Sequence, residues 1–217
     1  CHDFRQESVR GRIDGKLIQE TYGEWRFTEQ AAEGVTCQSC HMPEGRHLWR
    51  GVHDPEMVRS AFTATPALVE NGGVGDNLVA TLEITNTGAA HRFPTYTTPQ
   101  INLVLEQIDA DGEAIEGTDR MDAVARHLKP DLSREYFDTR LMPGESRTLD
   151  YEVERAAGAV SLRARIDVWP DEAYRRVYER KLANLENHRQ GESLLREALA
   201  NTYETRFTAW EQTLPLE

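Results

Sequence analysis

The segment NLVATLEITN, residues 77–86, alternates between apolar and polar side chains. Because successive side chains of an extended chain point to opposite faces, this alternation predicts a β-strand with one buried face. The residues expected on that face are Leu78, Ala80, Leu82 and Ile84. Such a strand needs a second layer to cover its apolar side, so the segment indicates a layered β-structure.

Neighbouring segments continue the same pattern. Residues 101–108, 147–153 and 160–168 are rich in alternating apolar side chains, and Asp109–Gly112 has the composition of a hairpin turn. Strands that follow one another without intervening helices are typical of an antiparallel fold. The sequence therefore predicts an antiparallel, immunoglobulin-like β-sandwich over residues 66–169.

The region before the sandwich, residues 1–65, has the pattern of short helices and loops. Thr21 and Glu24 have the spacing of a capping box, in which each side chain satisfies a backbone amide of the first helical turn. Asp54 followed by Pro55 is the expected start of another short helix, because aspartate caps and proline fits the first helical position.

The region after the sandwich, residues 170–217, contains two amphipathic stretches, with Gly191 expected to break them apart. They predict a helical hairpin that packs on the rest of the chain, followed by a final strand over residues 207–216. The expected fold class is thus α+β, in three parts divided at residues 65/66 and 169/170.

Composition and charge limit the classes of function. The 217 residues are 39% hydrophobic and 29% charged, which is typical of a globular protein. A formal net charge of −12 argues against nucleic acid or an anionic membrane as the main partner. We find no apolar run long enough to span a membrane, and the first residues lack the pattern of a signal peptide.

The chemistry of the sequence is concentrated in Cys37-Gln38-Ser39-Cys40-His41. This is the C-x-x-C-H motif, the attachment sequence of c-type haem. Two thiols separated by two residues can reach the two vinyl groups of one porphyrin, and the adjacent histidine can supply an axial nitrogen to the iron. The third cysteine, Cys1, is followed directly by His2.

Other interpretations of the motif remain open. A redox-active dithiol would be expected at a strand-to-helix junction of a βαβ unit, which the sequence lacks. Zinc is a stronger alternative, because Cys37, Cys40, His47 and His53 offer two thiolates and two imidazoles at local spacings. The motif could also occur by chance.

The sequence from Gly34 to Pro43, preceded by Thr21-Tyr-Gly-Glu-Trp25, resembles multihaem c-type cytochromes. This resemblance implies covalently attached haem c, with Cys37, Cys40 and His41 at one attachment site. It also implies that Cys1 and His2 are the last two residues of a preceding site. The alternative for Cys1 is the acylated N-terminal cysteine of a lipoprotein.

A second segment, Asn86-Thr-Gly-Ala-Ala-His91-Arg-Phe-Pro94-Thr95, resembles a histidine-containing loop in immunoglobulin-like domains fused to multihaem cytochromes. Those loops more often have glycine before the histidine, where this chain has Ala90. Together the two resemblances imply other redox proteins or haem domains as partners. They also imply a periplasmic or cell-surface location, since this type of haem attachment takes place outside the cytoplasm.

The second axial ligand of the haem is expected to be another histidine, as is common in multihaem proteins. The chain must pass from His41 around the porphyrin edge, and an extended chain covers at most about 3.3–3.6 Å per residue. We therefore expect His53 or His91, rather than His47, as the distal ligand of this haem. His47 is expected to reach the neighbouring haem, whose attachment site ends at His2.

The two remaining histidines are expected to be non-ligands. His127 lies in a polar segment before Lys129-Pro130, which predicts a loop. His188 lies near the expected end of a helix, where the helix dipole favours a cation.

Two main classes of function follow, and the sequence favours the first. The first is electron transfer by a multihaem cytochrome. The second is a multihaem redox enzyme subunit acting on small nitrogen or sulfur compounds, which would need an exchangeable axial position. A zinc-binding or β-sandwich interaction module is a third alternative. The sequence shows no nucleophile–base arrangement and no phosphate-binding glycine loop.

Overall fold

The computed structural model describes residues 12–13, 16–46, 48, 50–129, 131–184 and 189–217. Three residues expected in haem binding, Cys1, His2 and His47, lie outside the described residues, and so does His188. The fold is α+β, with two large antiparallel sheets, a short two-stranded one and several helices, which confirms the predicted fold class.

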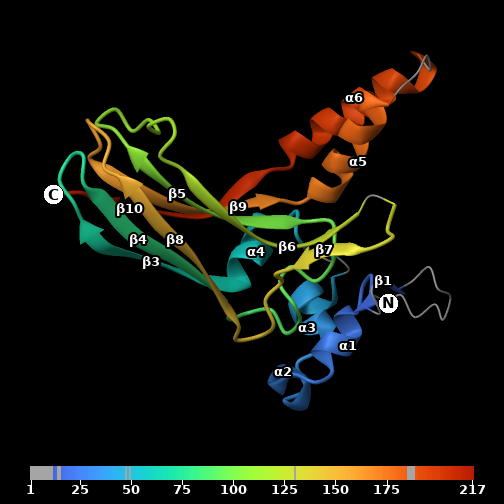
Figure 1. The fold of residues 1–217 in the computed structure, drawn as a ribbon. Coiled ribbons are helices and arrows are strands. Elements are labelled where there is room, and N and C mark those ends of the chain that lie inside the picture. Colours follow the sequence, from blue (N-terminus) through green and yellow to red (C-terminus); the bar gives the residue numbers. More distant parts are fainter. Residues whose placement is uncertain (1–11, 14–15, 47, 49, 130, 185–188) are drawn as a thin grey trace.

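The two sheets face each other as a β-sandwich (Figure 1). One has the order β3-β4-β8 and the other the order β10-β9-β5-β6-β7, and every pairing is antiparallel. The strands are β3 (Phe62–Asn71), β4 (Asn77–Asn86), β5 (Gln100–Ile108), β6 (Arg120–Leu128), β7 (Glu135–Asp138), β8 (Ser146–Glu154), β9 (Ser161–Trp169) and β10 (Phe207–Pro215).

The alternation that predicts β4 is also the reason that the sandwich has a core. Leu78, Ala80, Leu82 and Ile84 are fully buried, while their neighbours along the strand are partly or wholly exposed, apart from Asn86 at the strand end. The apolar face of β9 meets them from the other sheet within one continuous cluster. Each buried leucine or isoleucine stabilises the fold by about 1.5–3 kcal/mol relative to an exposed position.

Short elements precede the sandwich. They are β1 (Arg12–Ile13), β2 (Lys16–Leu17), α1 (Thr21–Trp25), α2 (Glu29–Ala32), α3 (Cys37–His41), the 3-10 turn η2 (Pro43–Gly45) and α4 (Pro55–Ser60). Asp54 caps α4 as expected, accepting hydrogen bonds from the amides of Glu56 and Met57. Strand β3 begins at Phe62 and runs across the expected boundary between residues 65 and 66.

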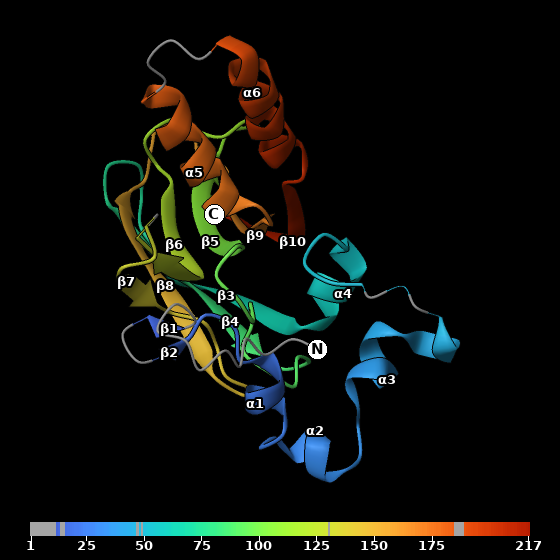
Figure 2. The same cartoon turned by 90° about the vertical axis from the view of Figure 1, so that its right-hand side faces the viewer.

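Two longer helices, α5 (Glu172–Ala183) and α6 (Arg189–Glu204), pair with each other and project from one end of the sandwich (Figure 2). Helices α1–α3 lie at the same end, on the opposite side of the sheets. After the hairpin the chain returns as β10, as the sequence predicts. Within the described residues, none of the helices is both long and apolar enough to cross a membrane.

Three local expectations from the sequence are wrong. His127 lies in β6 rather than in a loop, and Gly191 lies inside α6 rather than between two helices. The Thr21–Glu24 capping box does not form, because α1 begins at Thr21 itself and has no side-chain cap. Thr21 and Glu24 contact another part of the chain instead, as described below.

Candidate functional site

Helix α3 carries the C-x-x-C-H motif. Thr36 precedes the helix, and its amide donates to the Ser39 hydroxyl at 3.1 Å, which fixes the first turn. One helical turn separates Cys37 from Cys40, so both thiols lie on the same side of α3. Both are free thiols; Cys40 is exposed and Cys37 is partly exposed, so each is accessible to covalent modification.

Trp25 positions the segment that leads into α3. Its indole Nε1–H donates to the Val35 carbonyl at 3.0 Å, two residues before Cys37. This bond links the end of α1 to the segment just before α3, across a sequence separation of ten residues. The position of the motif is thus set by a side chain outside the motif.

His41 is oriented by a hydrogen bond between its Nδ1 and the Arg50 carbonyl oxygen, at 2.5 Å. Because a carbonyl can only accept, Nδ1 carries the proton and the lone pair of the neutral ring is on Nε2. This is the arrangement of metal-binding histidines, in which a second group fixes the tautomer and raises the basicity of the ligating nitrogen.

Arg50 is itself held at the start of α4. Its guanidinium binds the Asp54 carboxylate at 2.5 and 2.9 Å and the Glu56 carboxylate at 2.6 Å. The Arg50 hydrogen bonds lower the pKa of Asp54 to about 2, with a further contribution from the backbone amide of Met57. The ion pair therefore fixes the main chain that orients His41.

His91 lies in the loop between β4 and β5 and has the same tautomer. Its Nδ1 is 2.8 Å from the Arg92 carbonyl oxygen, so its lone pair is also on Nε2. The buried side chain of Asn86 shapes the loop. Its amide donates to the carbonyls of His91 at 2.9 Å and Leu141 at 3.0 Å, and its oxygen accepts from the Ala89 amide at 3.1 Å.

The structure brings His41 and His91 together. Their ring centres are 6.2 Å apart and their planes differ by 14°. An imidazole nitrogen binds a first-row metal ion at about 2.0–2.1 Å, and the ring centre lies about 1 Å further, so two imidazoles on opposite sides of one ion have centres about 6 Å apart. The distance between the two ring centres therefore matches that of two imidazoles bound to one metal ion, and His41 belongs to the same helix as both thiols of the motif.

Glu24 joins the N-terminal segment to the His91 loop. Its carboxylate accepts from the Arg92 amide at 3.1 Å and from the Thr95 hydroxyl at 3.3 Å, and it pairs with the guanidiniums of Arg92 and Arg140. Thr21 adds a hydroxyl contact to Thr95 at 2.7 Å. Burial raises the pKa of Glu24, against the opposing effect of the two arginines. The two residues of the expected capping box therefore bind another part of the chain.

The other described histidines are placed elsewhere. His53 is exposed, and its Nε2 lies 3.0 Å from the Asp171 carboxylate at the start of α5. His127 contacts the Gln100 side chain at 2.7 Å and packs on Phe137, and burial lowers its pKa to about 4. Of the two histidines expected as distal ligands, the structure brings His91 to His41 and pairs His53 with an aspartate.

A zinc site receives no support from the described part of the chain. No group of three or more histidine, cysteine, aspartate or glutamate side chains there has the arrangement needed to hold a metal ion. Of the two histidines in the expected zinc set, His53 pairs with Asp171 instead, and His47 lies outside the described residues.

Sequence reasoning missed Asn86, Glu24 and Arg50, which position the candidate ligands. Asn86 ends a strand and Arg50 precedes a helix, so each has an ordinary local explanation. Asn86 does stand at the start of the segment that resembles a cytochrome-associated loop, which is the one signal that could have drawn attention to it.

Comparison with solved structures finds a similar fold in a penta-haem cytochrome c552 from Thermochromatium tepidum. The TM-score is 0.64 and the sequence identity 21%, over 99% of this chain and 54% of that one. The chain therefore spans about half the length of that cytochrome and shares its fold.

Two other solved structures show much lower similarity. A Bordetella pertussis protein assigned as ApaA has a TM-score of 0.26 at 16% identity, and the match covers 49% of this chain and 74% of that one. Spo0M, a sporulation control protein from Bacillus subtilis, has a TM-score of 0.22 at 11% identity, covering 50% and 43%. No family model matches the sequence, and no curated protein matches it.

Proposed function

We propose that the chain is an electron-transfer module of a multihaem c-type cytochrome. Cys37 and Cys40 hold the haem through thioether bonds, His41 is the proximal ligand and His91 is the distal ligand. The observation that carries this proposal is the 6.2 Å separation of the two nearly parallel histidine rings beside the paired thiols. The haem, when bound, supplies a one-electron couple.

The residues around the two histidines would influence the reduction potential of the haem and the structural rearrangement that accompanies electron transfer. The carbonyls of Arg50 and Arg92 accept from Nδ1 of the two rings, which makes each Nε2 a stronger donor. With haem bound, stronger donation would favour the more highly charged iron, so these bonds would lower its reduction potential. Asn86 and the Arg50–Asp54 pair keep both rings in place, which limits the rearrangement that accompanies a change of charge.

Histidines on both sides of the iron favour electron transfer over the redox-enzyme alternative. A catalyst of small nitrogen or sulfur compounds needs an axial position that substrate can enter. In the proposed site His41 and His91 would bind the two axial positions, and the 6.2 Å separation of their ring centres supports this assignment.

The similar fold of a penta-haem cytochrome supports a larger assembly of haems around this chain. In this proposal Cys1 and His2 complete a preceding haem site, and His47 serves that neighbouring haem. Other haem domains or redox proteins are the partners, in the periplasm or at the cell surface. The three proposed parts are the haem segment 1–65, the β-sandwich 66–169 and the hairpin 170–217.

The β-sandwich is further proposed to be immunoglobulin-like. Its first, second and sixth strands form one sheet, while the third, fourth and fifth join the seventh and eighth in the other. This order corresponds to the sheets of immunoglobulin domains, in which strands A, B and E face strands G, F and C. The histidine loop then corresponds to the connection between strands B and C.

The test is haem attachment in protein produced with c-type maturation machinery. Intact mass and a pyridine haemochrome spectrum are measured for the wild type and for a Cys37→Ser/Cys40→Ser double variant. We expect the wild type to carry one haem more than the double variant, with a c-type spectrum. Equal masses would contradict the proposal and return attention to a β-sandwich interaction module.

A further inference from the structure

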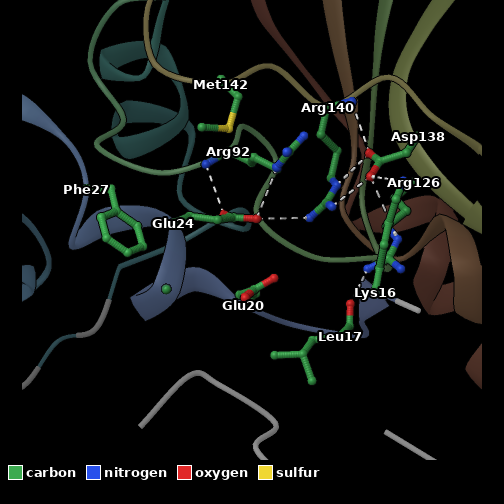
Figure 3. Close-up of a pocket in the computed structure, with 11 residues that line it drawn as sticks. Lys16, Leu17, Glu20, Glu24, Phe27, Arg92, Arg126, Asp138, Arg140 and Met142 are labelled. Carbon is green, nitrogen blue, oxygen red and sulfur yellow. Dashed lines mark hydrogen bonds and ion pairs between the residues drawn. The ribbon is translucent and has the colours of Figure 1, made fainter. Parts of the chain in front are cut away.

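A cavity of about 300 Å³ lies between the N-terminal segment and the sandwich (Figure 3). It is lined by residues from β2, α1, the His91 loop, β6, β7 and the segment after β7. These are Lys16, Leu17, Glu20, Gly23, Glu24, Phe27, Arg92, Arg126, Asp138, Arg140 and Met142. Four of the lining side chains are cationic and three are carboxylates, so the wall carries an excess of positive charge.

Most of these charges are already paired. Arg140 holds the Asp138 carboxylate through two bonds of 2.8 and 2.9 Å, and its remaining nitrogen donates to the Thr95 carbonyl. Glu24 accepts from Arg92 and lies 3.7 Å from Arg140, as Figure 3 shows. Lys16 pairs with Glu135 and Asp138. Arg126, by contrast, has a donor with no acceptor among the described residues.

Arg126 is 1% exposed, and within the described part of the chain one of its donor nitrogens has no acceptor. Its Nε donates to Glu135 at 2.7 Å, and its Nη1 donates to the carbonyls of Leu17 and Ile18 at 2.5 and 3.2 Å. Its Nη2 has no hydrogen-bond partner among the residues that the structure describes. A buried cationic donor without an acceptor is costly, and such groups are normally satisfied by a partner, a water or a ligand.

We propose that this cavity binds a carboxylate, with Arg126 as the principal donor and Arg92 as a second cation. The planar guanidinium fork matches the two oxygens of a carboxylate, and a partly enclosed site strengthens the charged hydrogen bond. Glu20 is a lining carboxylate for which the described residues show no ion pair, so it opposes the incoming anion.

Two sources of the carboxylate share this chemistry. One is a free small dicarboxylate from solution. The other is a propionate of the haem proposed above, because Arg92 directly follows His91 and its carbonyl orients that ring. The second source rests on the proposed function, whereas the first stands on the cavity alone.

The experiment uses haem-loaded protein and four variants: Arg126→Gln, Arg92→Gln, Glu20→Gln and Arg120→Gln. Arg120 lies exposed at the start of β6, outside the cavity, and is the matched control. Arg126→Gln also removes the bonds to Leu17 and Ile18, so circular dichroism checks its fold. Arg92→Gln loses only a side-chain contact to Glu24 and keeps the proposal testable if Arg126→Gln fails to fold.

Each preparation is first assayed for haem and then titrated calorimetrically with sodium succinate, against sodium chloride of equal ionic strength. If the cavity takes a small dicarboxylate from solution, the wild type and Arg120→Gln bind succinate saturably. Arg126→Gln and Arg92→Gln then bind it about tenfold more weakly or not at all, and Glu20→Gln binds it more tightly. Succinate binding that is unchanged in both arginine variants would overturn the proposal.

If the source is a haem propionate, succinate does not bind to the wild type. The pH dependence of the haem midpoint potential then differs in Arg126→Gln and Arg92→Gln from that of the wild type and Arg120→Gln, because the propionate loses the cations that keep it ionised. No succinate binding together with identical profiles in all proteins overturns the proposal. A preparation without haem contradicts the proposed function instead, and its succinate titration alone then decides the cavity.

Discussion

At the residue scale, the site depends on side chains that orient the ligands as much as on the ligands themselves. The backbone carbonyls of Arg50 and Arg92 fix the tautomers of His41 and His91, and Asn86 sets the loop that carries His91. Removing a side chain such as Asn86 leaves its buried hydrogen-bond partners unsatisfied, which lowers the free energy of unfolding by about 1–3 kcal/mol.

The distal ligand is tested by replacing His91. In haem-loaded His91→Ala, the iron loses its second axial nitrogen, so we expect a change from low-spin to high-spin visible and electron paramagnetic resonance spectra. His53→Ala is the matched control, because His53 pairs with Asp171 rather than with His41. A low-spin spectrum in His91→Ala combined with a high-spin spectrum in His53→Ala would identify His53 as the ligand.

Asp54 gives a pH-dependent prediction. Its pKa falls from an ordinary 3.8 to about 2 in the folded protein, mainly through the hydrogen bonds from Arg50. A carboxylate with a lowered pKa contributes stability that is complete above the ordinary value and is lost as the pH falls through the folded one. Asp54→Asn keeps an oxygen for capping α4 but loses the charge.

Urea unfolding of the wild type and Asp54→Asn between pH 7 and pH 2 measures this contribution. We expect the wild type to be more stable above pH 4, and the difference to shrink as the pH approaches 2. Asp54→Ala removes the cap as well and is expected to cost about 1 kcal/mol more than Asp54→Asn at every pH. A difference between wild type and Asp54→Asn that is independent of pH would contradict the assignment.

At the element scale, the histidine loop and α4 are held in close contact. The amides of Thr87 and Gly88 both donate to the Ala61 carbonyl just after α4. A Cβ atom added at Gly88 would lie 1.8 Å from the Ser60 carbonyl oxygen. The loop therefore requires glycine at this position because another backbone passes too close for any side chain.

Gly88→Ala is expected to lower stability by about 1–3 kcal/mol and to displace the loop that carries His91. Gly51→Ala is a suitable control, because a Cβ there meets nothing within 4 Å. Thermal unfolding measures the first effect, and the spin state of the haem-loaded protein measures the second. Equal stability of the two variants would show that the contact between loop and helix is not maintained in solution.

The same elements show what the sequence could predict. The strands with regular alternation, such as residues 77–86, form as expected because burial of one face determines them locally. The capping box expected at the start of α1 does not form, because distant contacts compete with it. Thr21 and Glu24 have the pattern of a cap, yet their side chains bind the loop around Thr95, about 70 residues away.

The candidate site divides in a similar way. The motif from Cys37 to His41 was visible because its chemistry lies within five consecutive residues. The choice between His53 and His91 was open, because chain length alone allowed both. The topology brings the loop between β4 and β5 to α3, and short-range patterns do not specify such a meeting of distant segments.

At the scale of the whole molecule, charge is the dominant property. The chain has a formal net charge of −12, which favours encounter with cationic partners through long-range attraction. Salt weakens this attraction, because the Debye length is only about 10 Å at 0.1 M ionic strength.

Stopped-flow measurements on the haem-loaded protein test this effect with two small redox reagents of opposite charge. Electron transfer with the hexaammineruthenium cation is expected to slow as ionic strength rises, and electron transfer with the ferricyanide anion is expected to accelerate. Salt dependences of the same sign for both reagents would mean that local charges around the site outweigh the net charge.

The pairing of His41 with His91 has a mechanical consequence. One histidine belongs to the N-terminal segment and the other to a loop of the sandwich, so a haem bound by both would tie two distant points of the chain together like a cross-link. The loop closed in this way has about 50 residues, and a permanent link of that length restricts the unfolded chain by about 4 kcal/mol. Attachment of the cofactor would then serve as the fastening step that secures the N-terminal segment to the sandwich.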